Sequence, residues 1–324
     1  MKPRVAICYP GFGDIDIELD ILRTLDADVI HAGATDTPAA KDAIRTADAV
    51  MVTVQPVPAD LIAGMECCRI IARVGTGLDA IDLEAATKQR VWVTYVPDYS
   101  IDEVSAHAIT LLLAQARGLA PLLKSSQAGK WDGGGVYVRR LQGQVLGIIG
   151  CGRIGLATAA KGRGLGLDVI GYDPYIDADQ LAANGVRAVD LPTLLRESDY
   201  ISLHMPLTAD NRHLINAAAL AQMKPSAYLV NTARGPLIDE AALLDAVRAG
   251  TIAGAALDVL TVEPPAADHP LMHEERILIT PHIAWYSEEA KVDVRRRGAE
   301  EVVRVLQGDA PRAPANRGAA NFIP

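Results

Sequence analysis

The feature that most constrains the fold is a glycine-rich stretch near the middle of the chain, Gly150-Cys151-Gly152-Arg153-Ile154-Gly155. The apolar run 145–149 precedes it and predicts a buried parallel strand, and a helical pattern follows it. Asp173 lies 18 residues after Gly155, at the end of a second apolar run. In this context the glycines permit a tight turn, a close approach of a pyrophosphate, and close packing of helix on strand. The stretch therefore predicts a dinucleotide site, with the pyrophosphate on the N–H groups of the helix N-terminus.

The choice of dinucleotide depends on Asp173. A carboxylate accepts a hydrogen bond from the ribose 2′-hydroxyl but repels a 2′-phosphate. Pro174, rather than an arginine, follows Asp173. The sequence therefore predicts NAD, not NADP, as the cofactor.

Short apolar runs alternate with helical patterns on both sides of the glycine stretch. The first hundred residues hold runs at 5–9, 29–30, 49–54, 70–73 and 91–95. A second series holds runs at 145–149, 169–172, 186–189, 200–204, 228–231, 255–259 and 277–280. This alternation predicts an α/β protein with two parallel-sheet domains, a flavodoxin-like one and a Rossmann-like one.

Between the two series the pattern changes. An S-x-x-E capping box at Ser100 and Glu103 predicts the start of a long apolar helix that reaches about Leu119. Residues 121–140 are expected to be irregular and to form an arm with exposed aromatic side chains. The end of the chain is expected to form an ordered strap or a frayed terminus.

Composition limits the class of protein. A length of 324 residues favours two domains, and a net charge of −9 argues against nucleic acid as a partner. The four cysteines have no metal-site or disulfide spacing, so no metal is expected and a reducing cytoplasm is. No apolar stretch reaches the length of a membrane span, and the chain enters a strand directly, so neither a membrane anchor nor a signal peptide is expected.

Three polar residues follow predicted strands of the second series: Arg234, Glu263 and His282. The carboxyl ends of parallel strands are where open α/β sheets place their chemistry. An arginine binds a carboxylate bidentately, a histidine exchanges a proton near neutral pH, and a carboxylate fixes the tautomer of that histidine. Beside a nicotinamide, these groups suit the interconversion of a 2-hydroxy acid and a 2-keto acid. Each residue alone also has an ordinary structural explanation as a surface or turn residue.

The chain resembles the D-isomer-specific 2-hydroxyacid dehydrogenases over nearly its whole length. Besides the glycine stretch, the similar segments are Arg73-Val74-Gly75-Thr76-Gly77-Leu78-Asp79, Ser202-Leu203-His204-Met205-Pro206-Leu207-Thr208, Asn231-Thr232-Ala233-Arg234-Gly235, Ala256-Leu257-Asp258-Val259, Glu263-Pro264-Pro265 and Pro281-His282-Ile283-Ala284-Trp285. The segments Pro97-Asp98-Tyr99, Tyr172-Asp173-Pro174-Tyr175 and Trp285-Tyr286-Ser287 resemble the C-terminal-binding-protein branch. Ala80, where the family usually has asparagine, departs from the pattern.

The resemblance implies a domain arrangement and a set of site residues. The NAD-binding domain, 100–285, is inserted in a substrate domain made of 1–99 and 286–324, and the arm at 121–140 joins two subunits. The implied catalytic residues are Arg234, Glu263 and His282. The implied cofactor residues are Gly150, Gly152, Arg153, Ile154, Gly155, Asp173, His204, Thr232, Ala233 and Asp258, of which Asp258 binds the nicotinamide carboxamide. The implied substrate residues are Arg73, the main chain of Val74 and Gly75, Arg234, and Trp285 as a pocket wall.

The function expected from these features is an NAD-dependent D-2-hydroxyacid dehydrogenase, a cytoplasmic homodimer that acts on a small or hydrophobic 2-keto acid. An NAD(H)-responsive scaffold with weak dehydrogenase activity, like the C-terminal-binding proteins, stays open as an alternative. So do hydroxypyruvate or glyoxylate reductase and phosphoglycerate dehydrogenase. The last is less favoured, because no regulatory domain or phosphate-binding cluster is expected.

Overall fold

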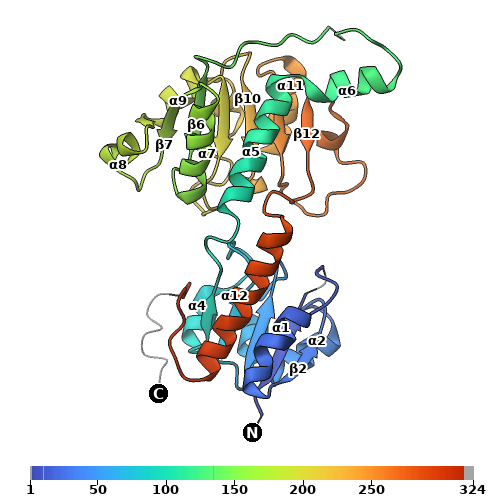
Figure 1. Ribbon diagram of the computed structural model, residues 1–324, viewed down its shortest axis with the longest axis vertical. Helices are drawn as coiled ribbons and strands as arrows, with labels where there is room; N and C mark the ends of the chain where they lie inside the picture. Colours follow the sequence, from blue (N-terminus) through green and yellow to red (C-terminus); the bar gives the residue numbers. More distant parts are fainter. Residues whose placement is uncertain (1, 10, 134, 317–324) are drawn as a thin grey trace. The chain divides into compact units, whose positions relative to one another are not determined.

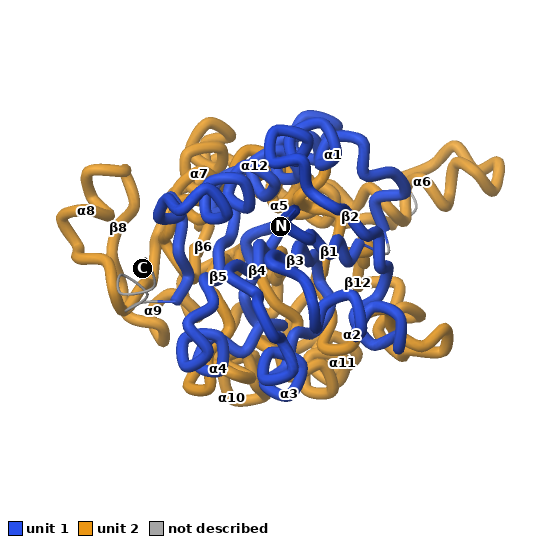
Figure 2. Tube along the Cα trace, turned by 90° about the horizontal axis from the view of Figure 1, so that it is seen from below, with its two compact units in different colours: residues 1–99, 287–324 blue, residues 100–286 orange. Residues whose placement is uncertain are grey.

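The chain forms two compact units. The computed structural model describes residues 2–9, 11–133 and 135–316. Unit 1 consists of residues 1–99 and 287–324, and unit 2 of residues 100–286 (Figures 1 and 2). Unit 2 is thus an insertion between two segments of unit 1. The second boundary lies one residue later than expected, because Tyr286 belongs to unit 2.

Unit 1 is built on a five-stranded sheet in the order β2-β1-β3-β4-β5, with every pair parallel. This is the strand order of a flavodoxin-like fold, as the sequence predicts. The strands are β1 (Arg4–Cys8), β2 (Asp28–His31), β3 (Ala49–Val52), β4 (Ile70–Arg73) and β5 (Trp92–Thr94).

Helices cover both faces of this sheet. The helices α1 (Asp16–Leu22) and α12 (Glu288–Leu306) lie side by side on one face, where Leu22 and Val294 join the core (Figure 1). On the other face, Ile44, Ile62 and Ala86 come from α2 (Pro38–Arg45), α3 (Ala59–Ala63) and α4 (Leu83–Lys88). A short 3₁₀ helix, η1 (Arg23–Leu25), follows α1.

The segment after α12 forms a strap along β5. Ala315 donates from its N–H to the carbonyl of Val93 at 2.7 Å. The buried side chain of Asn316 accepts from the N–H of Val93 at 3.0 Å and donates to the carbonyl of Val91 at 2.8 Å. The strap therefore satisfies backbone groups that an edge strand would leave unpaired. Of the two expectations for this segment, the ordered strap is confirmed through residue 316.

Unit 2 is built on a seven-stranded parallel sheet in the order β12-β11-β10-β9-β6-β7-β8. The strand order reverses between β6 and β9, as in a Rossmann fold, and ligands bind such sheets beyond the carboxyl ends at this point. The strands are β6 (Val145–Ile149), β7 (Asp168–Tyr172), β8 (Arg187–Ala188), β9 (Tyr200–Leu203), β10 (Tyr228–Asn231), β11 (Gly254–Leu257) and β12 (Ile277–Ile279).

Two helices of unit 2 depart from expectation. The buried helix α5 (Ile101–Ala116) ends before Leu119, because Gly118 adopts a left-handed conformation with φ +57°. A new helix, α6 (Leu119–Gln127), then occupies part of the segment expected to be irregular. Ser100 precedes α5 but makes no side-chain capping bond, because its backbone (φ −133°, ψ 29°) is not the extended form that capping requires.

The other helices of unit 2 connect its strands. They are α7 (Arg153–Gly164), α8 (Ala178–Ala183), α9 (Leu191–Glu197), α10 (Ala217–Leu220), η2 (Gly235–Leu237), α11 (Glu240–Ala249) and η3 (Pro270–His273). In the described part of the chain, no single helix has the length and apolar character of a membrane span. The helices α5 and α6 reach that threshold only as a pair bent by 64°.

Candidate active site

The glycine stretch forms the turn from β6 into α7, and each glycine has its own steric reason. Gly150 has φ +89°, and a Cβ there would lie 2.6 Å from the backbone nitrogen of Met205. At Gly155, a Cβ would lie 2.0 Å from the carbonyl oxygen of Gly150, so only glycine permits this packing of helix on strand. A Cβ at Gly152 would meet nothing within 4 Å, so this glycine borders open space. The N–H groups at the start of α7 carry no capping side chain, which is the arrangement that binds a phosphate.

Asp173, directly after β7, is joined to the glycine turn. Its Oδ2 accepts from the N–H of Cys151 at 2.8 Å, and its Oδ1 accepts from the N–H of Tyr175 at 2.9 Å. A carboxylate has about four acceptor positions, so two hydrogen bonds leave capacity for ribose hydroxyls. Burial first, and then the charge of Asp173, raises the pKa of the Cys151 thiol to about 12. This cysteine is therefore a neutral, buried thiol.

Two buried polar atoms near the ends of β9 and β10 lack a hydrogen-bond partner among the described residues. They are Nδ1 of His204 and Oγ1 of Thr232. Nε2 of His204 lies 2.8 Å from the hydroxyl of Ser202, and burial lowers the pKa of His204 to about 3. His204 is therefore neutral at physiological pH. Buried polar atoms in proteins are nearly always paired, so these two atoms have capacity for a hydrogen bond with a ligand.

Arg234 lies in the turn after β10, which a buried asparagine shapes. The Asn231 side chain accepts from the N–H of Ala233 at 2.9 Å and donates to the carbonyl of Arg234 at 2.8 Å. Arg234 itself donates to the carbonyl of Ala233 at 2.6 Å. Asn231 was not among the expected site residues, although asparagine three residues before the functional arginine is a signal for such a turn.

Glu263 and His282 are brought together as expected. Nδ1 of His282 donates to Oε2 of Glu263 at 2.5 Å, and Oε1 of Glu263 accepts from the N–H of Leu260 at 2.8 Å. Burial alone would raise the pKa of Glu263. The hydrogen bond and charge of His282, the Leu260 N–H and the charge of Arg234 outweigh burial and hold that pKa below its usual value. Glu263 is therefore an anion that fixes the tautomer of the His282 ring. Its bond to Nδ1 leaves Nε2 of His282 available for another hydrogen bond or a proton.

The loop that presents His282 is assembled on Asp258. His282 has φ +50°, a left-handed conformation that is unfavourable for a non-glycine residue. The buried Asp258 carboxylate accepts from the N–H groups of Ile283 at 3.0 Å and Ala284 at 2.9 Å. The carbonyl of Asp258 also accepts from the N–H of His282 at 2.8 Å. Asp258 thus holds the strained loop, and its expected contact with the carboxamide stays a prediction.

Asp258 is linked through Thr280 to His107 on α5. The hydroxyl of Thr280 donates to Oδ1 of Asp258 at 2.5 Å, so its oxygen accepts from Nε2–H of His107 at 3.0 Å. Neither Thr280 nor His107 was expected at the site. Their sequence separation of 173 residues gave no signal. Trp285 packs edge-on against Tyr286 with ring centroids 5.6 Å apart, and its role as a pocket wall stays a prediction.

In unit 1, the expected substrate residues follow β4. Arg73 donates to the carbonyls of Gly77 at 2.8 Å and Val74 at 2.5 Å. The N–H of Val74 donates to the carbonyl of Val52 at 2.8 Å. The N–H of Gly75 donates to the carbonyl of Arg73 at 3.0 Å. Both N–H groups therefore have a backbone acceptor within unit 1, and the expectation that main-chain groups of Val74 and Gly75 hold a substrate carboxylate stays a prediction. In the described chain, the next N–H groups, of Thr76 and Gly77, have no acceptor.

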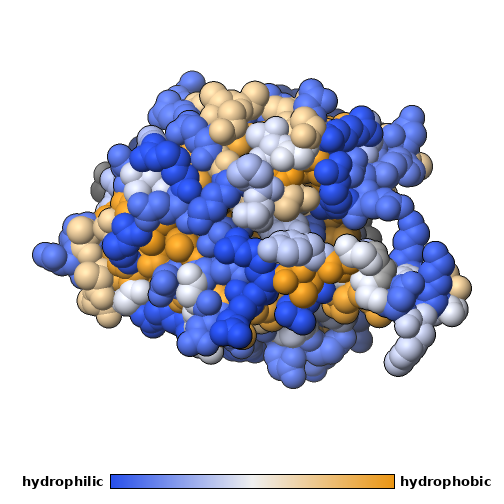
Figure 3. All heavy atoms as spheres, turned by 90° about the horizontal axis from the view of Figure 1, so that it is seen from above, coloured by the Kyte–Doolittle hydropathy of each residue, from blue (hydrophilic) through white to orange (hydrophobic). Residues whose placement is uncertain are grey.

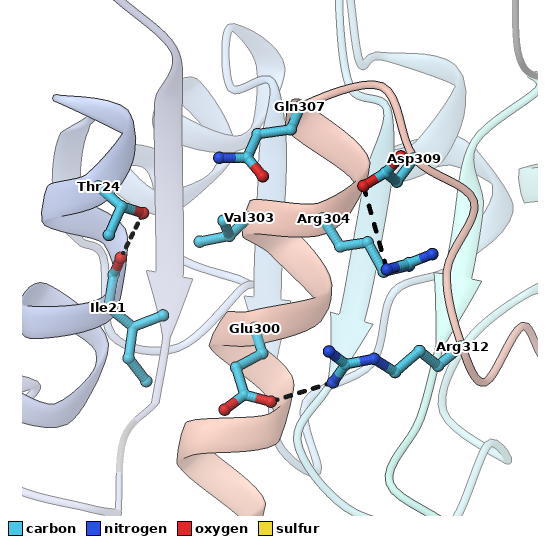
Figure 4. Close-up of a pocket in the computed structure, with 8 residues that line it drawn as sticks. All are labelled: Ile21, Thr24, Glu300, Val303, Arg304, Gln307, Asp309 and Arg312. Atoms are coloured by element: carbon cyan, nitrogen blue, oxygen red, sulfur yellow. Dashed lines mark hydrogen bonds and ion pairs between the residues drawn. The ribbon is translucent and has the colours of Figure 1, made fainter.

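A hollow of about 350 Å³ in unit 1 lies away from these residues (Figure 4). It is bounded by the C-terminal ends of α1 and α12, which are at the opposite end of the sheet from Arg73. Its charges are paired across its walls, Arg312 with Glu300 at 3.2 Å and Arg304 with Asp309 at 4.0 Å. Its charged side chains are therefore committed to one another.

Comparison with known proteins places the chain in a family. Residues 109–284 match the NAD binding domain of the D-isomer specific 2-hydroxyacid dehydrogenases. The chain belongs to this family. It is 40% identical over 268 residues to a D-3-phosphoglycerate dehydrogenase of Methanocaldococcus jannaschii, covering 82% of this chain and 51% of the relative. It is 35% identical over 344 residues to a glyoxylate reductase of Korarchaeum cryptofilum, covering 100% and 99%.

Solved structures agree with this membership. A D-lactate dehydrogenase of Aquifex aeolicus, complexed with NAD and lactic acid, superposes with a TM-score of 0.86 at 29% identity, covering 94% of this chain and 96% of that one. A glyoxylate reductase of Paecilomyes thermophila gives 0.88 at 26% identity, covering 97% and 99%. The chain spans about half the length of the phosphoglycerate dehydrogenases it matches, and nearly all of the glyoxylate reductase of Korarchaeum cryptofilum. The two-domain α/β fold is confirmed.

The residues of this chain fit NAD. Gly152 leaves room above the start of α7, where the pyrophosphate would bind. Asp173 keeps acceptor capacity for the ribose, and the unpaired atoms of His204 and Thr232 lie near the same carboxyl ends of the sheet. The family's NAD-binding domain is thus present, with residues that suit the cofactor.

Proposed function

We propose that this chain is an NAD-dependent dehydrogenase that interconverts D-2-hydroxy acids and 2-keto acids. The observation that carries the proposal is the His282–Glu263 pair at 2.5 Å, close enough to Arg234 for its charge to act on Glu263. All three residues lie beyond the carboxyl ends of the strands of the NAD-binding domain. A cation for the substrate carboxylate and an oriented proton donor are the groups that this reaction requires.

Each residue has one task in the reaction. The guanidinium of Arg234 binds the carboxylate and polarises the adjacent carbonyl. The nicotinamide, when bound, supplies or accepts the hydride. In reduction, protonated His282 gives the proton on Nε2 to the developing alkoxide, and in oxidation the neutral imidazole removes it. Ionised Glu263 holds Nδ1–H and stabilises the imidazolium while Nε2 faces the substrate.

The substrate is proposed to be a small or hydrophobic 2-keto acid. The relatives that support this choice are named for glyoxylate, lactate and phosphoglycerate, which share the 2-hydroxy or 2-keto carboxylate. A panel of glyoxylate, hydroxypyruvate, pyruvate and phenylpyruvate with NADH, followed by NADH absorbance, tests it. Binding of NADH without turnover of any member would favour the scaffold alternative, as in the C-terminal-binding-protein branch.

The assembly is proposed to be a homodimer through α6 and the arm that continues to residue 140. The side chains of Trp131 and Tyr137 are 99% and 83% exposed, and Leu119 and Leu123 on α6 are also exposed. Figure 2 shows α6 projecting from the rest of unit 2, and Figure 3 shows hydrophobic residues among hydrophilic ones on the surface. Such aromatic side chains are typical of interface centres. Sedimentation of Trp131→Ala beside the wild-type chain tests the proposal, which a monomeric wild type would contradict.

A cytoplasmic location is also proposed. The four cysteines are all free, which suits a reducing compartment. Fractionation of cells that produce the protein is the direct test, and recovery in an oxidising compartment would contradict it.

A further inference from the structure

A second histidine–carboxylate pair lies behind the catalytic one. Glu240 is the first residue of α11, and its Oε1 accepts from the N–H of Thr261 at 2.6 Å. Its Oε2 lies 3.4 Å from Nε2 of His269, and both side chains are largely buried. Thr261 and His269 belong to the connection between β11 and η3, which carries Glu263 between them. One carboxylate therefore joins two points of the loop that presents the catalytic glutamate.

The same loop is held on another side by a close backbone contact. A Cβ at Gly235 would lie 2.0 Å from the carbonyl carbon of Leu260 and 2.4 Å from the nitrogen of Thr261. Gly235 is the residue after Arg234, so this contact also sets the distance between the arginine turn and the glutamate loop. Within the loop, Glu263 returns to the N–H of Leu260 at 2.8 Å. Glu240 thus binds Thr261, which takes part in the Gly235 contact and lies two residues before Glu263.

Replacing Glu240 would remove both of its contacts with the loop. Nδ1 of His269 is buried without a partner in the described structure, so loss of Glu240 would remove the polar contact of the other ring nitrogen. The N–H of Thr261 would lose a charge-assisted bond, which is about twice as strong as a neutral one. The loop would then relax around Glu263, and the orientation of His282 would follow.

We propose that Glu240 is a positioning residue that acts through Glu263 to hold His282 in its reactive orientation. The inference rests on the proposed function, because it assigns Glu240 to the same proton transfer. Its role is to accept the N–H of Thr261, with His269 orienting the carboxylate. Glu240 touches neither substrate nor cofactor in this assignment.

Kinetics of Glu240→Ala and Glu240→Gln test the proposal. We expect Glu240→Ala to lower kcat about tenfold and to change KM less than about twofold, because orientation is lost while substrate binding is kept. Glu240→Gln keeps an oxygen for the Thr261 N–H and should recover most of kcat. The matched control is Glu84→Ala, which removes an exposed first-turn carboxylate from α4. A loss below twofold in Glu240→Ala, or an equal loss in Glu240→Gln, overturns the proposal.

A double-mutant cycle separates positioning from general destabilisation. If Glu240 acts through Glu263, its replacement should add less than about twofold to the loss in Glu263→Gln, whereas independent effects would multiply. Multiplying losses therefore overturn the proposal.

A readout without turnover keeps the two proposals apart. The short hydrogen bond between His282 and Glu263 should give a far-downfield proton resonance, absent in His282→Ala. It should be lost or moved in Glu240→Ala and kept in Glu240→Gln. An unmoved resonance in Glu240→Ala overturns the assignment of Glu240. Absence of turnover by the wild-type chain, with the resonance responding as expected, would overturn the proposed activity alone.

Discussion

Each unit contains a cluster of opposite charges, and the two clusters differ in burial and in the number of hydrogen bonds they make. In unit 1, Arg295 on α12 is 2% exposed and donates to both oxygens of Glu18, which is 0% exposed, at 2.9 and 2.7 Å. It also donates to the carbonyl and carboxylate of Asp14 at 2.9 and 3.0 Å. In unit 2, the side chains of His282 and Glu263 are 39% and 34% exposed and share one hydrogen bond.

The two clusters differ in whether a ring or guanidinium nitrogen near the charge remains open for a further hydrogen bond. Arg295 donates hydrogen bonds to Glu18 on α1 and to Asp14 in the loop before it. Its guanidinium lies 5.5 Å from the centre of the Phe12 ring. The bond to Glu18 and those to Asp14 outweigh burial and raise its pKa further, so it stays charged. His282 commits Nδ1 to Glu263, and among the described residues Nε2 has no partner. A buried arginine that is paired with two carboxylates stabilises a fold, whereas a partly exposed pair with an open ring nitrogen is suited to proton transfer.

The largest expected effect removes the open position. We expect His282→Ala to lower kcat by a factor on the order of 10²–10⁴, because general acid–base catalysis is lost. The free energy of unfolding should change by less than about 1 kcal/mol, since the imidazole is partly exposed. Steady-state kinetics and urea unfolding of the same preparation measure both. Loss of activity below threefold would remove His282 from the role.

The converse test removes the buried cation of unit 1, Arg295. We expect Arg295→Met to lower the free energy of unfolding by about 3–5 kcal/mol, because Glu18 is left buried and unpaired. The double variant Glu18→Leu, Arg295→Met removes both charges and should recover most of that loss. Urea unfolding followed by circular dichroism measures the change. A double variant less stable than the single one would show that the pair contributes more than it costs to bury.

A third test asks whether Asp173 belongs with the structural or the functional carboxylates. It accepts two backbone N–H groups, as a structural residue does, yet it is expected to bind ribose. We expect Asp173→Ser to move the ratio of kcat/KM for NADH over NADPH by about 1–2 kcal/mol, or about five- to thirtyfold. Asp173→Asn is the control that keeps the shape. An unchanged ratio in both would make Asp173 purely structural.

The smallest effect is on pH dependence. The lowered pKa of Glu263 means that its pairing stabilises the site above the usual glutamate pKa of about 4.3 and is lost as pH falls through the lower folded value. Reduction needs protonated His282 and should be favoured as pH falls toward that range, whereas oxidation should be favoured at higher pH. Rates in both directions across pH test this. Reduction that speeds up with rising pH would contradict the mechanism.

The sequence was informative wherever a rule acts along the chain. Strand periodicity predicted both sheets, and the glycine spacing predicted the turn before α7. The rule that parallel strands place their carboxyl ends together made Arg234, Glu263 and His282 candidates, and the structure brings Glu263 and His282 into hydrogen-bond contact. For Val74 and Gly75 the sequence could not show which N–H groups are free, because this depends on the neighbouring strand, and the carbonyl of Val52 accepts from the N–H of Val74.

Thus the sequence by itself determined the fold class, the family and the candidates for the reactive residues, because each follows from local periodicity, glycine geometry or a short motif. The tertiary structure decided what supports them. His107 contacts Thr280, Asp258 holds the strained loop at His282, and Glu240 holds the loop of Glu263. It also decided that the Arg295–Glu18 pair of unit 1 is buried while the His282–Glu263 pair of unit 2 is partly exposed. These contacts join residues far apart in the chain, whose meeting is fixed only when the strands take their register.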